Sequence, residues 1–273
     1  SLQKEKLEAL DHMKSRFFTN ISHELRTPLT LISSPIQHIL HTEQNLPLKI
    51  SEPLQLMLRN TRQLKGLVND IMDLAKLESN KAKLQEKPIL IKSFLNRAAS
   101  NFESLAHHLD IQYRIELDIP CKMTMMMDAP KVEKIVNNLL SNAIKHTPSQ
   151  QTVSICAQMR GAQLAITVKD TGTGIKPEDL PHIFDRYYQS KQEQDTLQGG
   201  TGIGLALVKE LTDIMLGKLI IDSEYGRGST FTLLLPFRPT CMRGHELGVD
   251  EKWLGNDPVH FFQKENHGVH TCK

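Results

Sequence analysis

The sequence lacks the features of several large protein classes. It has no uninterrupted run of about 18 apolar residues and no signal peptide with a basic start and an apolar centre, so no membrane contact is expected from this stretch of chain. The net charge is only +2 over 273 residues, and no basic stripe is interleaved with aromatic residues. That argues against nucleic-acid binding. With 39% hydrophobic and 23% charged residues, the chain is typical of a globular protein of about two domains.

Cysteine is also scarce. The four cysteines lie far apart with no C-x-x-C pair, which argues against a disulfide framework or a zinc knuckle and suits a reducing cytosol. The methionine run at 123–127 is better explained as a buried strand leading into Asp128 than as a copper site. Four histidines near the C-terminus fit no known metal-ligand spacing; they are His245, His260, His267 and His270.

The first part of the chain, residues 1–84, is predicted to form two long helices. Apolar residues recur at three- and four-residue steps over 7–39 and again over 54–77, and the segment 41–51 between them is expected to be a turn. Pro28 is expected to bend the first helix. An isolated hairpin of this length buries both apolar stripes poorly. Pairing of two hairpins into a four-helix bundle, and therefore a homodimer, is expected.

The second part, residues 86–237, alternates between helical and strand patterns. This texture predicts an α/β domain in which helices cover one face of a mixed sheet. From residue 238 to 273 the periodicity is lost, and a linker or tail is expected. Helices are predicted at 131–146 and 205–215, and strands at 111–117, 153–159, 164–169, 218–222 and 229–235.

Two glycine-rich stretches follow or precede these elements. Asp170–Ile175 comes directly after a predicted strand, and Gly199–Leu205 opens a predicted helix. Glycines let a backbone approach a ligand closely, and a helix N-terminus offers free N–H groups to phosphates. A Rossmann site is excluded because no βαβ unit with a following acidic residue is present, and a Walker loop is excluded because no Gly-Lys-Ser/Thr occurs. The remaining interpretation is a nucleotide-binding site of another type, with an aspartate just before its first glycine turn.

The predicted helix 131–146 carries polar residues on one face. Asn138 and Asn142 are four residues apart, and Lys145 lies about one turn further. Mg²⁺ prefers oxygen ligands, so amide oxygens beside phosphates suit a magnesium–nucleotide complex. The alternative is a polar helix face in solvent. The apolar neighbours Leu139 and Leu140 leave little room for a purely exposed surface.

These stretches, in this order, closely resemble the bacterial sensor histidine kinases of two-component systems. Phe18–Leu29 looks like the H box of that family, with His23 in it, and Asn138–Pro148 looks like its N box. Asp170–Ile175 resembles the first glycine box. Phe184–Tyr188 resembles the F box, and Gly200–Leu205 resembles the second glycine box. One such motif can arise by chance, whereas five in order are specific.

The resemblance implies a dimerisation and histidine phosphotransfer hairpin at 1–84, a Bergerat-type catalytic ATP-binding domain at 86–237 and a linker or tail at 238–273. It implies ATP and Mg²⁺ as cofactors and autophosphorylation on His23. The phosphoryl group then passes to an aspartate of a response-regulator receiver domain, which is the expected partner. The tail is compatible with a hybrid protein that carries its own receiver, although no receiver sequence is present here.

The resemblance also assigns residues. The aspartate matching Asp170 hydrogen-bonds the adenine amino group in that family, and the asparagine matching Asn142 coordinates Mg²⁺ with help from Asn138 and Lys145. His146 stands where tyrosine is common, which leaves its role open. The expected metal ligands are Asn142 and Asn138, and the expected nucleotide-binding residues are Asn138, Asn142, Lys145, His146, Asp170, Gly172, Gly174, Ile175, Phe184, Gly200, Thr201, Gly202, Ile203, Gly204 and Leu205.

The chemistry expected at His23 follows from imidazole itself. The ring must attack phosphorus through a neutral nitrogen, and histidine is partly neutral near physiological pH. Glu24 is placed to accept the proton of the other ring nitrogen as a general base. Taken alone, one histidine among twelve is more often a surface residue. Glu24 and Thr27 also match positions that orient water in relatives with receiver phosphatase activity, which leaves that second activity open.

Two other functions are compatible with parts of this pattern. Heat-shock chaperones, mismatch-repair ATPases and gyrase subunits share the nucleotide fold but lack an H box on a preceding hairpin. A pseudokinase scaffold would bind nucleotide or a receiver without transferring phosphate, and only a phosphotransfer test excludes it. The chain begins inside a helical pattern, which is typical of a fragment. By family analogy it is expected to be the cytoplasmic portion of a sensor tethered to the inner membrane.

Overall fold

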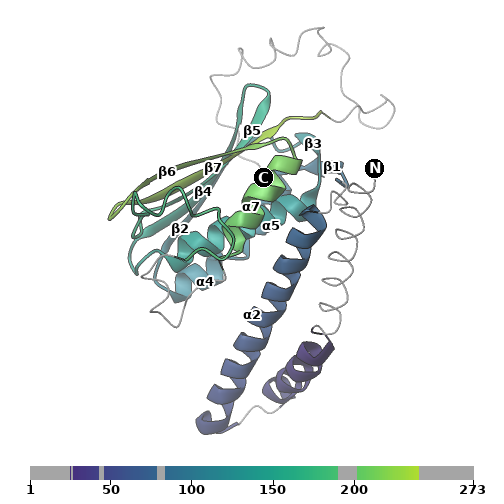
Figure 1. Cartoon of the computed structure of the whole chain (residues 1–273), viewed down its shortest axis with the longest axis vertical. Coiled ribbons are helices and arrows are strands. Elements are labelled where there is room, and N and C mark those ends of the chain that lie inside the picture. The colour runs from purple at the N-terminus through teal and green to yellow at the C-terminus, as the bar shows by residue number, and fades with distance from the viewer. Residues whose placement is uncertain (1–24, 26, 43–45, 79–83, 190–201, 240–273) are drawn as a thin grey trace, which may run out of the picture. The chain divides into compact units, whose positions relative to one another are not determined.

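The computed structural model describes residues 25, 27–42, 46–78, 84–189 and 202–239 (Figure 1). The chain forms two compact units. The first contains residues 1–83 and 182–210, and the second contains residues 84–181 and 211–273. His23, Glu24, Gly200 and Thr201, together with the expected tail from residue 240 onward, lie outside the described residues.

The described residues of the N-terminal segment are mostly helical, as the periodicity predicts. One helix occupies residues 27–42, and α2 spans Leu48–Glu78. The helix α2 begins directly after Pro47, whose carbonyl accepts the N–H groups of Ile50 and Ser51. The turn expected over 41–51 is therefore too long, because a residue just after proline is free to enter a helix. No helix in the described part of the chain is long and apolar enough to cross a membrane.

The second unit is built on a five-stranded sheet in the order β2-β4-β5-β7-β6. The edge strand β2 pairs parallel with β4, and the other neighbours pair antiparallel, so the sheet is mixed as predicted. The hairpin turn between β4 and β5 contains Gly161 in the left-handed conformation. The bounds are β2 Gln112–Asp118, β4 Thr152–Arg160, β5 Gln163–Asp170, β6 Lys218–Glu224 and β7 Gly228–Pro236.

Helices α3 (Ile91–Ser100), α4 (Glu103–His108) and α5 (Ala129–Lys145) pack against this sheet. The helix α5 starts at Asp128, whose side chain accepts the backbone N–H of Lys131 as an N-cap. Its apolar face is fully buried, and each such aliphatic side chain contributes about 1.5–3 kcal/mol of burial free energy. The buried residues of α5 are Val132, Ile135, Val136, Leu139, Leu140, Ala143 and Ile144. A further helix, α7, spans Gly204–Ile214.

A two-stranded antiparallel ribbon stands beside the main sheet. It pairs β1 (Lys87–Leu90) with β3 (Thr124–Met127). The expected strand before Asp128 is confirmed: Met125 and Met127 are each only 3% exposed, whereas Met126, expected to be buried, is half-buried on the other face. Among the described cysteines, Cys156 has a free thiol, whereas Cys121 is disulfide-bonded. Nothing in the cysteine spacing predicts that bond.

Candidate functional site

The polar face of α5 is sheltered. Asn138, Asn142 and Lys145 are half-buried, while the intervening Ser141 is exposed. Asn138 donates its amide to the Lys134 carbonyl one turn earlier (2.9 Å). The Asn142 side chain makes no hydrogen bond to any other described residue, so its amide oxygen remains available to a ligand. A fully solvated polar face, the alternative reading of the sequence, does not fit this burial.

Asp170 ends strand β5 and is only 6% exposed. Its Oδ1 atom accepts the backbone N–H groups of Gly172 (2.9 Å) and Ser229 (3.2 Å). Burial raises the pKa of the carboxyl above its usual range, while these two hydrogen bonds and the nearby His146 act in the opposite direction. The two N–H groups fix the side chain, and Oδ2 has no hydrogen bond among the described residues. The site therefore presents one oriented carboxylate oxygen.

The loop after Asp170 packs tightly on the end of α5. A Cβ atom at Gly172 would lie 2.2 Å from the carbonyl oxygen of His146, and the same oxygen accepts the N–H of Thr173 (3.1 Å). His146 is also the C-cap residue of α5. The structure thus brings Asp170, Gly172 and His146 together, although they come from two separate motifs of the sequence.

The far side of the same loop rests on the turn between β6 and β7. Gly174 has a φ of 63°, and a Cβ there would lie 2.1 Å from the carbonyl oxygen of Glu224. Ile175, which is half-buried, donates its N–H to Ser223 Oγ (2.9 Å). Only glycine fits between two backbones at this distance. The first glycine stretch is therefore held between the end of α5 and the β6–β7 turn.

Two residues of this arrangement escape the sequence analysis. Ser229 holds Asp170 through its backbone N–H, and Gly228, with a φ of 110°, would place a Cβ 2.2 Å from the carbonyl oxygen of Asp170. The only available signal is the Gly226-Arg227-Gly228 run between two predicted strands. Since Ser229 acts through its backbone, its side-chain type carries no information on this role.

The remaining predicted residues belong to the first unit. Within it, Tyr187 donates its N–H to the Gly202 carbonyl (2.8 Å), and both residues have positive φ values near 65°. A Cβ at Gly202 would lie 2.6 Å from the Tyr187 carbonyl carbon. The stretch around Phe184, which is half-buried, is thus tied to the second glycine stretch. Ile203 is fully buried, and Gly204 and Leu205 open α7.

The candidate phosphoacceptor His23 and its neighbour Glu24 lie outside the described residues. Thr27 is exposed on the helix over 27–42. In the described part of the chain no group of three or more histidine, cysteine, aspartate or glutamate side chains could hold a metal ion. The amide oxygens of α5 are of the type that Mg²⁺ prefers, and such a set needs phosphate oxygens and water to complete it.

Comparison with known families gives two matches in order along the chain. The model of the His Kinase A (phospho-acceptor) domain matches residues 13–80. The model of the histidine kinase-, DNA gyrase B-, and HSP90-like ATPase matches residues 127–239. The second match contains the Asn138–His146 and Asp170–Ile175 stretches of the site.

The curated relatives are named as histidine kinases or as sensor proteins. The chain is 36% identical over 241 residues to hybrid signal transduction histidine kinase D of Dictyostelium discoideum. It is 32% identical over 229 residues to phosphate regulon sensor protein PhoR of Pseudomonas aeruginosa. These alignments cover 86% and 83% of the chain but 15% and 51% of the relatives. The chain therefore spans about half or less of the length of these relatives.

Solved structures agree in architecture. Full-length ShkA in complex with AMPPNP superposes with a TM-score of 0.68 at 26% identity, covering 82% of this chain and 46% of that one. The Acinetobacter baumannii histidine kinase AdeS superposes with a TM-score of 0.55 at 21% identity, covering 79% of this chain and 98% of that one. The second likeness bears on the fold alone.

Proposed function

This chain belongs to the sensor histidine kinases of two-component systems, and we propose that it transfers the γ-phosphoryl group of ATP to His23 and then to a receiver aspartate. The proposal assigns residues 1–84 to the dimeric phosphoacceptor hairpin, 86–237 to the ATP-binding domain and 238–273 to a linker or tail. The partner is a response regulator.

The observation that carries nucleotide binding is the orientation of Asp170. Its Oδ1 is occupied by two backbone N–H groups, and Oδ2 is left for a ligand donor. An adenine amino group is such a donor. A buried acceptor of this kind discriminates strongly, because a base without the amino group leaves the carboxylate unpaired.

Two groups of residues, one in each unit, are each of a kind that suits the phosphate end of the nucleotide. Asn142, with Asn138, would supply amide oxygens to Mg²⁺, and Lys145 would supply positive charge near the phosphates. Bound Mg²⁺ would neutralise charge that develops on the transferring phosphoryl group. The backbone N–H groups at the start of α7, next to Gly202 and Gly204, suit phosphate oxygens, because a helix N-terminus favours anions.

In the proposed transfer step His23 is the nucleophile and Glu24 is the general base. The lone pair of a neutral imidazole nitrogen of His23 forms a bond to the γ-phosphorus, the bond from phosphorus to the β-bridging oxygen breaks, and ADP leaves. Glu24 accepts the proton from the other ring nitrogen, which keeps the phosphorylated ring from carrying an extra positive charge. In the second step an oxygen of the receiver carboxylate forms a bond to the phosphorus, the bond from the His23 nitrogen to phosphorus breaks, and Glu24 returns the proton, so that His23 is again a neutral imidazole.

A homodimer is supported by the surface of α2. Ile50, Met57 and Leu64 are about half exposed and lie seven residues apart, at 50%, 54% and 48% exposure. A stripe of apolar residues with a seven-residue period is the seam of a left-handed helical bundle. We propose that this stripe is covered by a second copy of the hairpin in a four-helix bundle.

Two further assignments rest on likeness to relatives. Glu24 and Thr27 are proposed to orient water when the chain dephosphorylates a receiver, which loss of receiver dephosphorylation in Thr27→Ala would test. The relatives include sensor proteins, and we propose that the whole protein is a sensor bound to the inner membrane by segments other than those described. Fractionation of cells that express the whole protein tests the second assignment.

Incubation with γ-labelled ATP and Mg²⁺ tests the central proposal. Unaltered chain is expected to gain acid-labile, alkali-stable label, His23→Ala is expected to gain none, and Asn142→Ala is expected to gain label at least about a hundredfold more slowly. Nucleotide binding without label in a confirmed dimer would instead support the pseudokinase scaffold. Label that survives in His23→Ala would place the phosphoacceptor elsewhere.

A further inference from the structure

Strand β1 and the segment that follows β7 both lie against strand β3 of the second unit. On one edge, β3 pairs antiparallel with β1, where the incoming chain first becomes regular, with Lys87 opposite Met127. On the other edge, the Met126 N–H donates to the Arg238 carbonyl (2.9 Å), and Met125 forms a bridge with Pro239. The outgoing chain, which follows β7, therefore lies against β3 as well.

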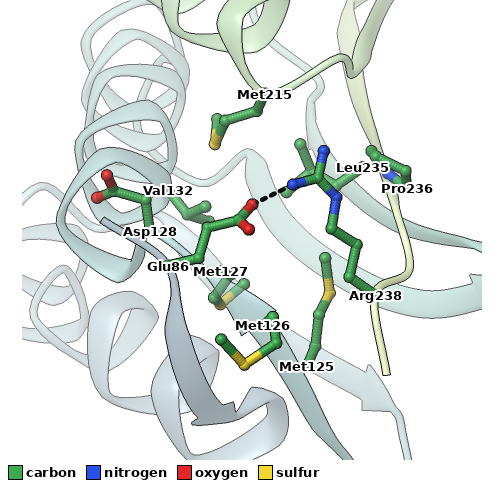
Figure 2. A pocket seen from close by; sticks show the side chains of 10 residues that line it. All are labelled: Glu86, Met125, Met126, Met127, Asp128, Val132, Met215, Leu235, Pro236 and Arg238. Atoms are coloured by element: carbon green, nitrogen blue, oxygen red, sulfur yellow. Dashed lines mark hydrogen bonds and ion pairs between the residues drawn. The ribbon is translucent and has the colours of Figure 1, made fainter. Parts of the chain in front are cut away.

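An ion pair joins these two segments directly. The guanidinium of Arg238 contacts Oε1 of Glu86, which immediately precedes β1. The two side chains are 36% and 28% exposed, and they extend over a small pocket lined by Met125, Met215 and other apolar side chains (Figure 2). A pair with this exposure contributes little to overall stability. Its main effect is therefore on the position of the segment before β1 relative to the segment after β7, and its contribution to the free energy of unfolding is small.

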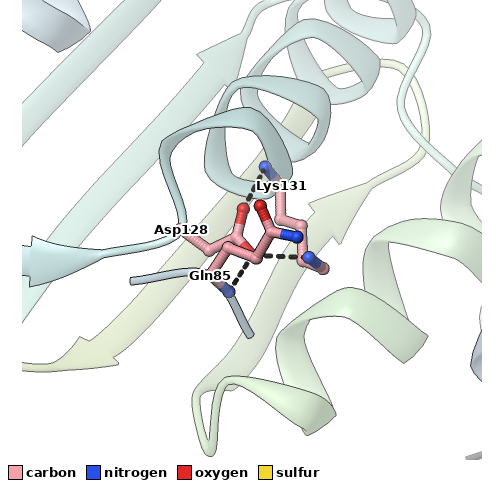
Figure 3. Close-up of polar contacts among 3 residues, drawn as sticks. All are labelled: Gln85, Asp128 and Lys131. Carbon is pink, nitrogen blue, oxygen red and sulfur yellow. Dashed lines mark hydrogen bonds and ion pairs between the residues drawn. The ribbon is translucent and has the colours of Figure 1, made fainter. Parts of the chain in front are cut away.

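The incoming chain is also bonded to the start of α5. The Gln85 N–H donates to Oδ2 of Asp128 (2.9 Å), and the ammonium group of Lys131 contacts the same oxygen (Figure 3). Asp128 is only 2% exposed and caps α5 through its other oxygen. Three donors thus converge on one buried carboxylate, one of them from the segment that precedes β1. Moving Gln85 would leave part of this buried charge unsatisfied.

We infer that Glu86, Arg238 and Asp128 form a junction that positions α5 for nucleotide binding; this rests on the proposed function. The helix is rigid, and Asn138 and Asn142 lie 10 and 14 residues after Asp128, about 15–21 Å along its axis. A shift at the capped end is therefore carried to the amides. A displacement of the segment at Gln85, or of the segment at Arg238, is therefore transmitted through the junction to α5 and shifts the nucleotide-binding side chains. These three are positioning residues.

Charge variants in the full chain test the junction. Glu86→Gln and Arg238→Gln each remove the ion pair, and the double variant Glu86→Arg/Arg238→Glu rebuilds it with reversed charges. Arg114→Gln is the matched control, because it removes the charge of an exposed arginine on the edge strand β2 in the same unit. Two readouts are followed: amide hydrogen exchange in the first two turns of α5, and affinity for a non-hydrolysable ATP analogue with Mg²⁺.

Each single variant is expected to raise exchange in those turns and to weaken analogue binding by about two- to fivefold, the range for a partly exposed pair. The reversed pair is expected to restore both, and the control is expected to change neither. Asp128→Asn keeps the capping oxygen but loses the charge that faces Lys131. It is expected to raise exchange further, and to weaken analogue binding more, than either single variant. Single variants that match the Arg114→Gln control, or a reversed pair no better than the singles, would overturn the junction.

Both readouts are independent of phosphotransfer, so the junction and the proposed function can fail separately. If the unaltered chain binds the analogue but forms no phosphohistidine, the proposed function fails and the exchange and affinity data still decide the junction. If phosphohistidine forms normally and the variants behave like the control, only the junction fails.

Discussion

The backbone at Gly172 lies directly against the carbonyl group of His146, so closely that a Cβ would sit 2.2 Å from its oxygen and 2.9 Å from its carbon. These residues belong to the two ends of the candidate site, the loop after β5 and the C-cap of α5. The contact fixes the distance between the Asp170 carboxylate and the polar face of α5. Neither backbone can yield without displacing its element.

Gly172→Ala is therefore expected to move the loop away from α5. We expect the free energy of unfolding to fall by about 1–3 kcal/mol, the cost of forcing an extra methyl group into a packed site. ATP affinity is also expected to fall, because the Gly172 N–H orients the Asp170 carboxylate that faces the ligand. Thermal unfolding and titration with a fluorescent ATP analogue measure the two effects. Gly161→Ala, in open space at a φ of 59°, should lose stability only; a similar loss of affinity there would contradict the argument.

Asp170→Asn is expected to separate folding from recognition. The amide oxygen can still accept the Gly172 and Ser229 N–H groups, and the variant avoids ionising a buried group whose pKa is raised mainly by burial. The melting temperature is expected to stay level or rise. Analogue affinity is expected to fall about tenfold or more, since an NH₂ group would face the adenine amino donor. Asp222→Asn, exposed on β6, is the control; a normal affinity in Asp170→Asn would refute the assignment.

Asn142→Ala tests the magnesium ligand. We expect the autophosphorylation rate to fall about a hundredfold or more at saturating Mg²⁺, because loss of one ligand misplaces the charge that stabilises phosphoryl transfer. Binding of the analogue in the presence of chelator is expected to change little. Ser141→Ala, exposed on the same helix, should behave like the unaltered chain. Equal losses with and without Mg²⁺ would indicate a structural role instead.

Tyr113 provides a pH-dependent stability test. Its hydroxyl donates to the Ala99 carbonyl (2.9 Å), and burial, with a smaller contribution from Glu103, raises its pKa. A raised folded-state pKa contributes stability that is complete below the unfolded value, about 10, and is lost as the pH rises beyond it. Tyr113→Phe is expected to lose about 1 kcal/mol at neutral pH and to lessen the decline above pH 10. Denaturant unfolding from pH 7 to 11 measures both, with the half-exposed Tyr225→Phe as control.

Met57→Glu and Leu64→Glu test the dimer. Each places a charge in the apolar stripe of α2, and two copies facing each other would repel as well as lose apolar contact. The chain is expected to sediment as a monomer after either change, while the melting transition of the second unit persists. Gln55→Glu, which is exposed on the opposite face of the same helix, should remain dimeric. A monomeric unaltered chain would overturn the assignment of the stripe.

Strongly periodic elements were predictable. Strand β2 alternates between exposed and half-buried residues along its whole length, and α5 buries seven apolar residues on one face, as the sequence indicates. The ribbon strand β1 and helix α3 were not predicted. The four residues of β1 are too short for a periodic signal, and α3 follows it without a capping side chain at Leu90. Such elements are decided by long-range pairing, here with β3.

The sequence by itself determined the order of motifs, the residue types of the candidate site and the periodicity of the main elements, because these depend on local spacing. Only the tertiary structure decided which atoms meet. The Gly172 and Ser229 N–H groups donate to Asp170 Oδ1, and Glu86 pairs with Arg238, which is 152 residues away. These contacts depend on the register of β3, β5 and β7. Register is a property of packed strands, and backbone donors such as Ser229 leave no trace in the side-chain sequence.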